Sequence, residues 1–573
     1  MSGMTLAEAA EHITSTDPLY AVGEADIRGV TLPVFTNIPK SLRELQQYGR
    51  EDRDYSDYII YQDERWSYER YCAESNKISH ILTERLGIKP GDHVAIAMRN
   101  YPEYLSLFMG IVNIGAVAVL VNAWWTTDEL TYGFEDSGAK LVFADGPRAE
   151  RIAPFAEKLG ITTVGVRDMT DGVTLDGLLA QTDDTRWPTV DIDPDADFAL
   201  MYSSGSTGHP KGIMLTHRGA LSAVFTWNMS LLLPPLMTPE GEPTPPNPGP
   251  QSLLIATPLF HVTASHALYL LSMALRAKVV IMHKWDGAEA LRLINQEQVT
   301  RFVGVPTMTA DMRDVAERDG IETPSLQVLT SGGAKRPPAQ VGEQAEAFPN
   351  AAIASGWGMT ETNAAGIAIS GPDYVGRPNQ AGRIFPPLQE ARIVDANNVE
   401  VPRGALGELS VKGPNMMRCY HNKPEATTET LIDGWLLSGD LGIMDEDGYV
   451  TIVDRAKNII IRGGENISGL EVEAAIHQHP SVGEAAVFAC PDDRYGEVVG
   501  AIVWLKEDEV MTGADVKAFL TDKIASYKHP AKLWWTDAPL LKGATDKIDR
   551  RALKDLCLSG EVGTEPLEAY ASG

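Results

Sequence analysis

Hydrophobic and polar positions divide this chain into two alternating kinds of segment. Short apolar runs at 92–98, 140–145, 251–258 and 300–306 are typical of buried strands. Longer stretches with helical spacing lie between such runs, for example 67–87, which ends in glycine, and 288–298. We interpret 101–119 as one further helix. Strands that alternate with helices predict parallel sheets covered by helices, and therefore an α/β fold.

The pattern changes near residue 455. Residues 447–480 are typical of a hairpin, a loop and a helix, and two strands (484–490 and 496–505) and a helix (514–525) follow. We therefore expect a large domain at 1–454 and a smaller α+β domain at 458–573 with a loose tail. The proline-rich stretch 234–250 is expected to be a surface loop, since proline suits neither a helix interior nor a central strand.

Composition narrows the classes of function. The 573 residues are too many for one core, and the formal net charge of -29 argues against a general nucleic-acid binder. The four cysteines are far apart, which favours a reducing cytoplasm over a zinc site. We find no signal-peptide pattern and no apolar run of about 18 residues, so we expect no transmembrane segment. Weak peripheral attachment stays possible on this evidence.

One polar loop stands out, YSSGSTGHPKG at 202–212. It lacks the GK[ST] ending of a P-loop. Its glycines would still let backbone N–H groups face inward, its hydroxyls would add donors, and Lys211 would add charge. A strand before it and a helix after it (212–225) would place it at the carboxyl edge of a sheet. From spacing alone, a phosphate-binding loop and a plain surface turn both remain open.

Six more segments follow this loop in order: PLFHV (258–262), SGGA (331–334), GWGMTET (356–362), GWLLSGD (434–440), DRAKNIIIRGGENIS (454–468) and ATDKIDR (544–550). Together these motifs resemble those of the AMP-forming adenylating enzymes, over roughly residues 50 to 553. The likeness is greatest to bacterial fatty-acyl-CoA and aryl-CoA synthetases. It implies a large N-terminal domain of sheets and helices and a small mobile C-terminal domain.

The resemblance also implies a reaction in two halves. A carboxylate attacks the α-phosphate of ATP, which gives acyl-AMP and pyrophosphate, and the thiol of coenzyme A then displaces AMP. Both reactants of the first half are anions, so cations and N–H donors must offset their repulsion. By motif position, Lys547 is the catalytic lysine, Thr360 meets phosphate, Glu361 binds Mg²⁺, and His261 gates the acyl site.

The nucleotide residues follow from the same motifs. Asp440 would accept the ribose hydroxyls, Arg455 would assist at ribose or phosphate, and Trp357 would cover adenine. The full ATP- and AMP-binding set implied is Ser203, Ser204, Gly205, Ser206, Thr207, Gly208, Lys211, Gly332, Gly333, Ala334, Gly356, Trp357, Gly358, Met359, Thr360, Asp440 and Arg455. The hinge and the coenzyme A tunnel would contain Lys457, Gly463, Gly464 and Glu465.

One position departs from the family pattern. Where the family usually has Thr-Gly-Lys, this chain has Thr545-Asp546-Lys547. An aspartate that paired with Lys547 would slow adenylation. We expect Asp546 to point away, because the flanking residues fit the motif.

The acyl pocket is expected to contain Trp227, His261, Ser265, Val305, Gly332 and Asn363. No arginine or lysine lies among the segments from which they come, which favours a hydrophobic monocarboxylic acid. A medium or long fatty acid is the first candidate, and an aryl or steroid-side-chain acid is the alternative. Ser265 takes the place of a bulky tryptophan gate in some long-chain enzymes. His477 and His479 are expected to be exposed.

Other functions remain as alternatives. An amide-forming relative would transfer the acyl group to an amine, and a luciferase would need only the adenylation half. A degenerate nucleotide-binding scaffold would form no AMP at all. The family often dimerises, so a homodimer is possible.

Overall fold

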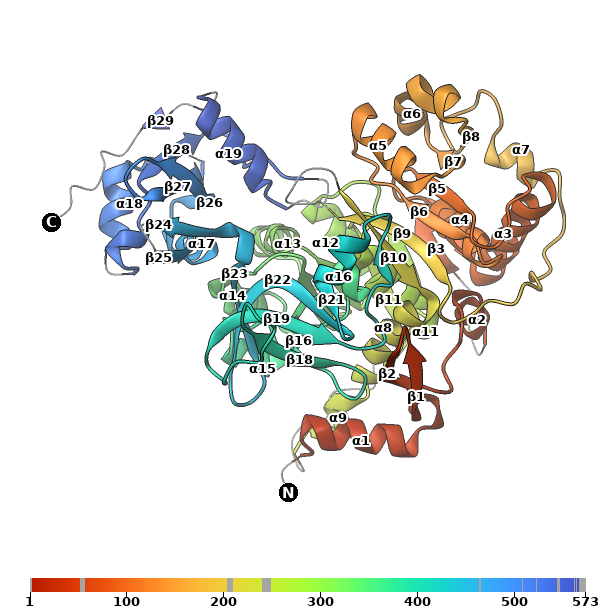
Figure 1. Ribbon diagram of the computed structural model, residues 1–573, viewed down its shortest axis with the longest axis horizontal. Helices are drawn as coiled ribbons and strands as arrows, with labels where there is room; N and C mark the ends of the chain where they lie inside the picture. The colour runs from red at the N-terminus through yellow and green to blue at the C-terminus, as the bar shows by residue number, and fades with distance from the viewer. Residues whose placement is uncertain are drawn as a thin grey trace.

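The computed structural model describes residues 3–51, 57–203, 210–239, 249–462, 465–507, 509–521, 523–543, 547–560, 562 and 564–565 (Figure 1). It is a mixed α/β structure in which a large N-terminal domain precedes a smaller C-terminal domain, as the sequence predicts. The small domain stands at one side of the large one in Figure 1, coloured blue.

A seven-stranded sheet occupies the first part of the large domain. Its order is β20 (Cys419–Tyr420), β10 (Lys211–Thr216), β9 (Asp197–Ser203), β6 (Val117–Leu120), β5 (His93–Ala97), β7 (Leu141–Ala144) and β8 (Thr162–Gly165). The helices of this region are α3 (Tyr68–His80), α4 (Pro102–Val112), α5 (Thr127–Ser137), α6 (Gly146–Leu159) and α7 (Leu175–Leu179). The strands β6, β5, β7 and β8 run parallel, as expected.

Two sequence interpretations in this sheet are wrong. The helix expected over 101–119 ends at Val112, because Gly115 adopts a positive φ of 73° and turns the chain into β6. The loop at 202–212 does not lead from a strand into a helix. It joins two antiparallel strands, with Lys211 opposite Ser203, and helix α8 (His217–Ser230) begins only after β10.

A nine-stranded sheet forms the second part. Its order is β17 (Arg383–Ile384), β16 (Ile367–Ser370), β15 (Ala352–Trp357), β14 (Val328–Gly332), β13 (Arg301–Gly304), β11 (Ser252–Ile255), β12 (Lys278–Ile281), β3 (Asp57–Tyr61) and β4 (Glu64–Ser67). Six strands from β3 to β15 are parallel. Helices α12 (Gly287–Gln296), α13 (Pro306–Asp319) and α14 (Ala339–Ala347) accompany them, and α15 (Gly371–Gly376) follows β16.

Smaller elements complete the large domain. A five-stranded sheet contains β18 (Glu390–Val394), β19 (Leu406–Lys412), β22 (Trp435–Met444), β21 (Leu431–Ile432) and β23 (Val450–Arg455), with α16 (Pro424–Thr430) beside it. A hairpin of β1 (Val22–Ile27) and β2 (Val30–Phe35) precedes α2 (Leu42–Tyr48). The segment after β11 forms α10 (Val262–Ala264), a π-helix (Ser265–Leu270) and α11 (Leu271–Ala274).

The small domain is built on a separate sheet. It contains β24 (Ile459–Arg462), β25 (Glu465–Ser468), β26 (Val482–Asp492), β27 (Gly496–Leu505), β28 (Lys532–Thr536) and β29 (Thr564–Glu565). Helices α17 (Gly469–His477), α18 (Gly513–Leu520) and α19 (Arg550–Ser559) belong to it. The exact boundary at 454–458 stays a prediction.

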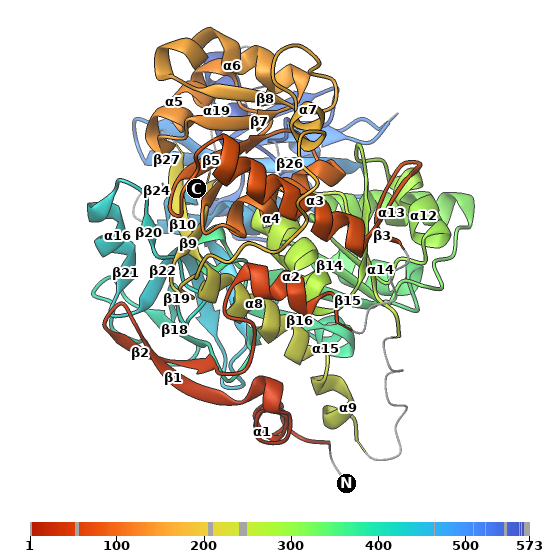
Figure 2. The same ribbon diagram turned by 90° about the vertical axis from the view of Figure 1, so that its right-hand side faces the viewer.

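The start of the proline-rich insert is helical, contrary to expectation. Helix α9 (Leu233–Met237) has its prolines in the first turn, where a missing N–H costs little. It lies beside α1 (Leu6–Thr16), as Figures 1 and 2 both show, and the N–H of Met4 donates to the Leu236 carbonyl at 3.1 Å. Residues 240–248 lie outside the described residues. Within the described part, no helix has both the length and the apolar character to cross a membrane.

Candidate active site

A connected cleft runs between the carboxyl ends of β14 and β15, the strand β22, and the small domain. Parallel pairing places Gly332 beside Gly356. Gly333 has a φ of 75°, and a Cβ on it would lie 2.9 Å from Nζ of Lys547. The absence of a side chain at 333 therefore lets Lys547, from the small domain, approach the backbone of the large domain.

Trp357, Asp440 and Arg455 form one hydrogen-bonded group in this cleft. The indole Nε1 of Trp357 donates to Oδ2 of Asp440 at 2.7 Å, and Nε of Arg455 donates to Oδ1 at 3.0 Å. Antiparallel pairing of β22 and β23 sets Asp440 directly opposite Arg455. Three residues predicted to bind nucleotide thus meet in the fold although they come from three separate motifs.

A second group joins the phosphate-loop motif to the GWGMTET motif. Nζ of Lys211 lies 4.6 Å from the ring centre of Tyr420, whose hydroxyl donates to Oε1 of Glu361 at 2.9 Å. Pairing of β10 with β20 brings Tyr420 there. Glu361 is buried, and burial raises the pKa of its carboxyl group. A carboxylate oxygen is the kind of ligand that a hard metal ion such as Mg²⁺ prefers.

Lys547 and His261 have perturbed protonation. Burial of the Lys547 ammonium group, and then the positive charge of Arg455, lower the pKa of Lys547 to about 8. The negative charge of Asp440 acts in the opposite direction. Burial, and then the charge of Lys547, lower the pKa of His261 to about 3. The imidazole is therefore neutral at pH 7, and its Nε2 has no hydrogen-bond partner among the described residues.

The structure brings some predicted acyl-pocket residues into the cleft wall and leaves others out. Trp227, His261, Val305 and Gly332 line the cleft. Ser265 and Asn363 do not. Instead they bond to opposite sides of the buried His266: the Ser265 hydroxyl is 2.9 Å from Nδ1, and Nε2 is 3.1 Å from Oδ1 of Asn363. Sequence position could not show this, because the π-helix that begins at Ser265 changes which residues face inward.

Several other predicted residues can be placed. Those that line the cleft are Ser203, Lys211, Gly333, Ala334, Gly356, Gly358, Met359 and Thr360. Glu465 begins β25 and is exposed. Lys457 lies in a short 3₁₀ turn, Ala456–Asn458. The residues Ser204, Gly205, Ser206, Thr207, Gly208, Gly463, Gly464 and Asp546 lie outside the described residues.

Two histidines of the small domain, His477 and His479, are not exposed as expected. His477 is half-buried and lines the same cleft. His479 is half-buried too, with its ring centre 4.7 Å from that of Phe519.

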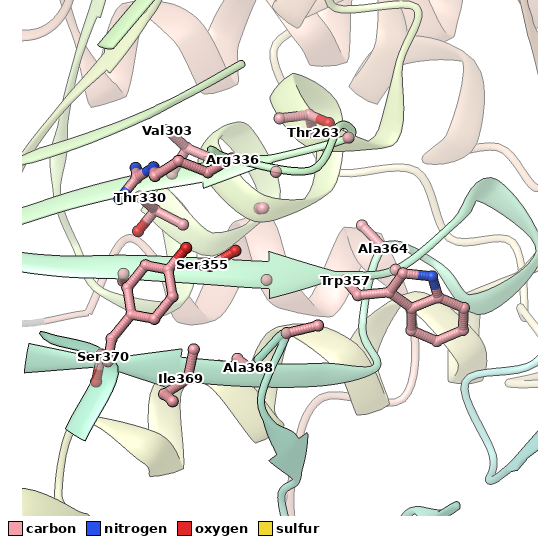
Figure 3. Close-up of a pocket in the computed structure, with 18 of the residues that line it drawn as sticks. Thr263, Val303, Thr330, Arg336, Ser355, Trp357, Ala364, Ala368, Ile369 and Ser370 are labelled. Atoms are coloured by element: carbon pink, nitrogen blue, oxygen red, sulfur yellow. The ribbon is translucent and has the colours of Figure 1, made fainter. Parts of the chain in front are cut away.

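Sequence reasoning missed several arginines of the cleft wall, among them Arg301 and Arg336. Arg301 opens β13, and Nε donates to Oε1 of Gln251 at 3.0 Å. Arg336 follows the SGGA motif by two residues and is only 3% exposed. Figure 3 shows its side chain beside Thr330, in the same pocket as Val303, Ser355, Ala368 and Ile369. The closeness of Arg336 to the SGGA motif is the signal that could have found it.

Family comparisons agree with this geometry. The model of the AMP-binding enzyme family matches residues 46–421, and that of the AMP-binding enzyme C-terminal domain matches 471–547. The chain belongs to the AMP-binding enzymes. It is an acid–thiol ligase of this family, whose CoA ligases use ATP, Mg²⁺ and coenzyme A.

Three relatives illustrate the range of similar proteins. A long-chain-fatty-acid–CoA ligase of Mycobacterium tuberculosis is 30% identical over 498 residues, which is 86% of this chain and 93% of the relative. A feruloyl-CoA synthase of Amycolatopsis sp. is 34% identical over 473 residues, 82% of this chain and 90% of the relative. The structure of o-succinylbenzoate CoA synthetase from Bacillus subtilis with its acyl-adenylate superposes with a TM-score of 0.76 at 28% identity, covering 89% of this chain and 97% of that one.

Proposed function

We propose that this enzyme activates a carboxylic acid with an extended, mainly apolar body as its acyl-AMP and then forms the coenzyme A thioester. The observation that carries the proposal is the position of Lys547. Its ammonium group belongs to the small domain but lies in the large-domain cleft, near Gly333 and within electrostatic reach of Asp440, Arg455 and His261. A cation at that point suits a reaction between two anions.

Each end of the nucleotide has candidate partners. Lys211, Thr360 and the loop from Ser203 would hold the phosphates, and Glu361 would hold Mg²⁺, which offsets phosphate charge when bound. Asp440 would accept the ribose hydroxyls, since each of its oxygens keeps a lone pair beside the bond that it accepts from Trp357 or Arg455. Gly332, Gly333 and Ala334 would lie against adenine, where larger side chains would not fit.

Lys547 would act in the adenylation step itself. Below pH 8 its ammonium charge offsets the negative charge shared by the attacking carboxylate oxygen and the α-phosphate. The new O–P bond forms as the bond to pyrophosphate breaks. His261 stays neutral and so adds no competing charge. We further propose a hinge at Lys457 between residues 454 and 458, and a thiol tunnel at Gly463, Gly464 and Glu465.

The apolar body is supported by the rest of the cleft wall. Trp227, Leu268, Leu271 and Val305 line it, and the lining extends to Leu6 and Ile13 of α1. A medium or long fatty acid is our first candidate, and an aryl or steroid-side-chain acid the second. The sequence argument for a plain monocarboxylic acid rested on a wall without arginine, and Arg336 changes that argument for one end of the pocket.

Acid-dependent release of pyrophosphate tests the proposal. The purified chain with ATP and Mg²⁺ is offered a panel of fatty, cinnamic, benzoic and steroid-side-chain acids, each with and without coenzyme A. We expect release that depends on the acid, and an acyl-CoA product by mass spectrometry. Product formation with an amine in place of coenzyme A would support the amide-forming alternative. No release with any acid would contradict the proposal and implicate Asp546.

The setting of the reaction is also a proposal. The cysteines at 72, 419, 490 and 557 are free thiols. Free thiols fit a reducing compartment, and we propose the cytoplasm. We propose a homodimer solely because members of the family often dimerise, and sedimentation velocity would test it.

A further inference from the structure

Arg336 is a buried cation that lacks a hydrogen-bond partner within the described part of the chain. It leaves the loop after β14, and its Nε, Nη1 and Nη2 are all buried with no hydrogen-bond partner among the described residues. Its guanidinium lies 5.6 Å from the ring centre of Tyr374, a residue of α15 that is itself buried. The ring face attracts the charge but cannot accept the guanidinium's five N–H groups.

Such an arrangement is costly unless something else occupies the site. Burial lowers the pKa of Arg336 to about 10, so the group stays protonated at neutral pH. A buried charge is normally paired, and buried donors are normally hydrogen-bonded. Arg301 shows the usual solution in the same wall, since its Nε is bonded to Gln251. The exception at Arg336 therefore points to an occupant that supplies acceptors.

The position of Arg336 indicates which part of an occupant it would meet. In Figure 3 its guanidinium is directed toward Thr330 and away from Trp357. Trp357 marks the nucleotide end, because it is bonded to Asp440. Val303 is drawn beside Arg336 in the same view, and Ala368 and Ile369 lie along the neighbouring strand β16; all three line the cleft and suit an apolar body. An acid activated near Lys547 would therefore extend its far end toward Arg336.

We propose that Arg336 binds an oxygen acceptor at the end of the acid remote from the activated carboxylate. The substrate class is then an acid with an apolar body and a distal carboxylate or carbonyl group. The planar fork of the guanidinium matches a carboxylate with two parallel bonds and a carbonyl with one. A plain alkyl end would leave all five donors unpaired. This inference rests on the proposed function and narrows its first candidate from a plain fatty acid to an acid whose far end carries oxygen.

The first test needs no variant. Acids of equal length that end in a methyl, a methyl ketone or a carboxylate are compared by acid-dependent pyrophosphate release. We expect kcat/KM for an oxygen-bearing acid to exceed that for the methyl acid by about 100-fold, since a site built for hydrogen bonds rejects an analogue without them. Preference for the carboxylate or for the ketone then identifies the group. Equal or better use of methyl-ended acids at every length would overturn the proposal.

The second test assigns the preference to Arg336. In Arg336→Met, the ratio of kcat/KM for the oxygen-bearing acid to kcat/KM for the methyl-ended acid should fall close to one, with turnover of methyl-ended acids retained. Arg336→Lys should keep part of the preference. Arg301→Met is the matched control, because it removes a cleft arginine that already has a partner, and the ratio should survive. An unchanged ratio in Arg336→Met, or an equal loss in Arg301→Met, would overturn the assignment.

These tests separate this inference from the proposed function. Pyrophosphate release that continues in Arg336→Met without a change of preference contradicts the inference alone. Absence of release in the unaltered enzyme contradicts both. Because the preference is a ratio measured within one preparation, partial misfolding of a variant cancels from it.

Discussion

The charged side chains at the two ends of the cleft differ in whether they have hydrogen-bond partners. At the nucleotide end, Asp440 takes hydrogen bonds from Trp357 and Arg455, and Tyr420 connects Lys211 to Glu361. At the other end, Arg336 is buried with no bonded partner among the described residues. A hydrogen-bonded network is preorganised for a reaction step that is the same for every acid. A cation without a hydrogen-bond partner instead favours a substrate that carries an acceptor for it. On the roles proposed above, reactivity and selectivity reside in different parts of the cleft.

The largest effect is expected from Lys547→Ala. The variant removes the small-domain ammonium group that lies beside Gly333, and with it charge stabilisation of adenylation, so we expect acid-dependent pyrophosphate release to fall by about 100- to 1,000-fold. Lys523→Ala is the control, because Lys523 is an exposed lysine of the same domain. Retained release in Lys547→Ala would mean that the nucleotide end does not depend on the small domain.

The next largest effect is expected from Asp440→Asn. An amide cannot keep both charge-assisted bonds, so KM for ATP should rise by about 10- to 100-fold. KM for the acid should stay within about threefold if the two ends act separately. Initial rates with each substrate varied would measure both. A matching rise in KM for the acid would break the separation of the two ends.

The pH dependence should follow Lys547. Its pKa is lowered to about 8, so the group is charged below that pH and neutral above it. The kcat/KM of adenylation should therefore fall about tenfold per pH unit above pH 8. His261, with a pKa of about 3, should add no acid limb above pH 5. In Lys547→Arg, kcat/KM should no longer fall above pH 8, whatever the absolute rate of the variant. A fall that persists in this variant would belong to the titration of another group.

Ser265→Trp tests where the pocket wall ends. Ser265 is 1% exposed and faces His266, so a tryptophan there should overpack the core and lower stability by about 1–3 kcal/mol or more. Chain-length preference should not change in the folded fraction. Urea denaturation and an acid panel measure the two effects. A stable variant that excludes only large acids would return Ser265 to the pocket.

The smallest effect is expected from Tyr374→Leu. Removal of the ring beside Arg336 takes away a cation–π contact, and preference for oxygen-ended acids should fall by about three- to tenfold. The expected loss is smaller than that in Arg336→Met, because the guanidinium remains. Competition between paired acids would report it. A larger loss than in Arg336→Met would make Tyr374 the recognition residue.

Much of the fold and of the nucleotide end could be predicted from the sequence. Motifs such as GWGMTET and GWLLSGD specify backbone shape locally, so Trp357 and Asp440 could be proposed for one common site before the hydrogen bond between them was seen. The hairpin at Lys211 was missed because a strand of six residues ahead of a helix has no periodicity of its own.

The lining of the proposed acid-binding end was predicted less well, for a physical reason. Which side chains face a pocket depends on helix register and on long-range packing. The π-helix at Ser265 shifts that register, and the loop after Gly333 turns Arg336 inward. Neither effect can be read from residue type, since arginine in a Pro-rich loop is usually solvated.

Asp454, near the end of β23, restricts the orientations that the small domain can take relative to the large domain. Its Oδ2 accepts bonds from the hydroxyl of Ser468 at 2.9 Å and from the N–H of Leu470 at 3.1 Å, at the start of α17. A turn of the small domain away from β23 must break both bonds at once. Intermediate angles would then cost these bonds without gaining new ones. The two domains should therefore exchange between a few discrete orientations rather than turn freely about the connection.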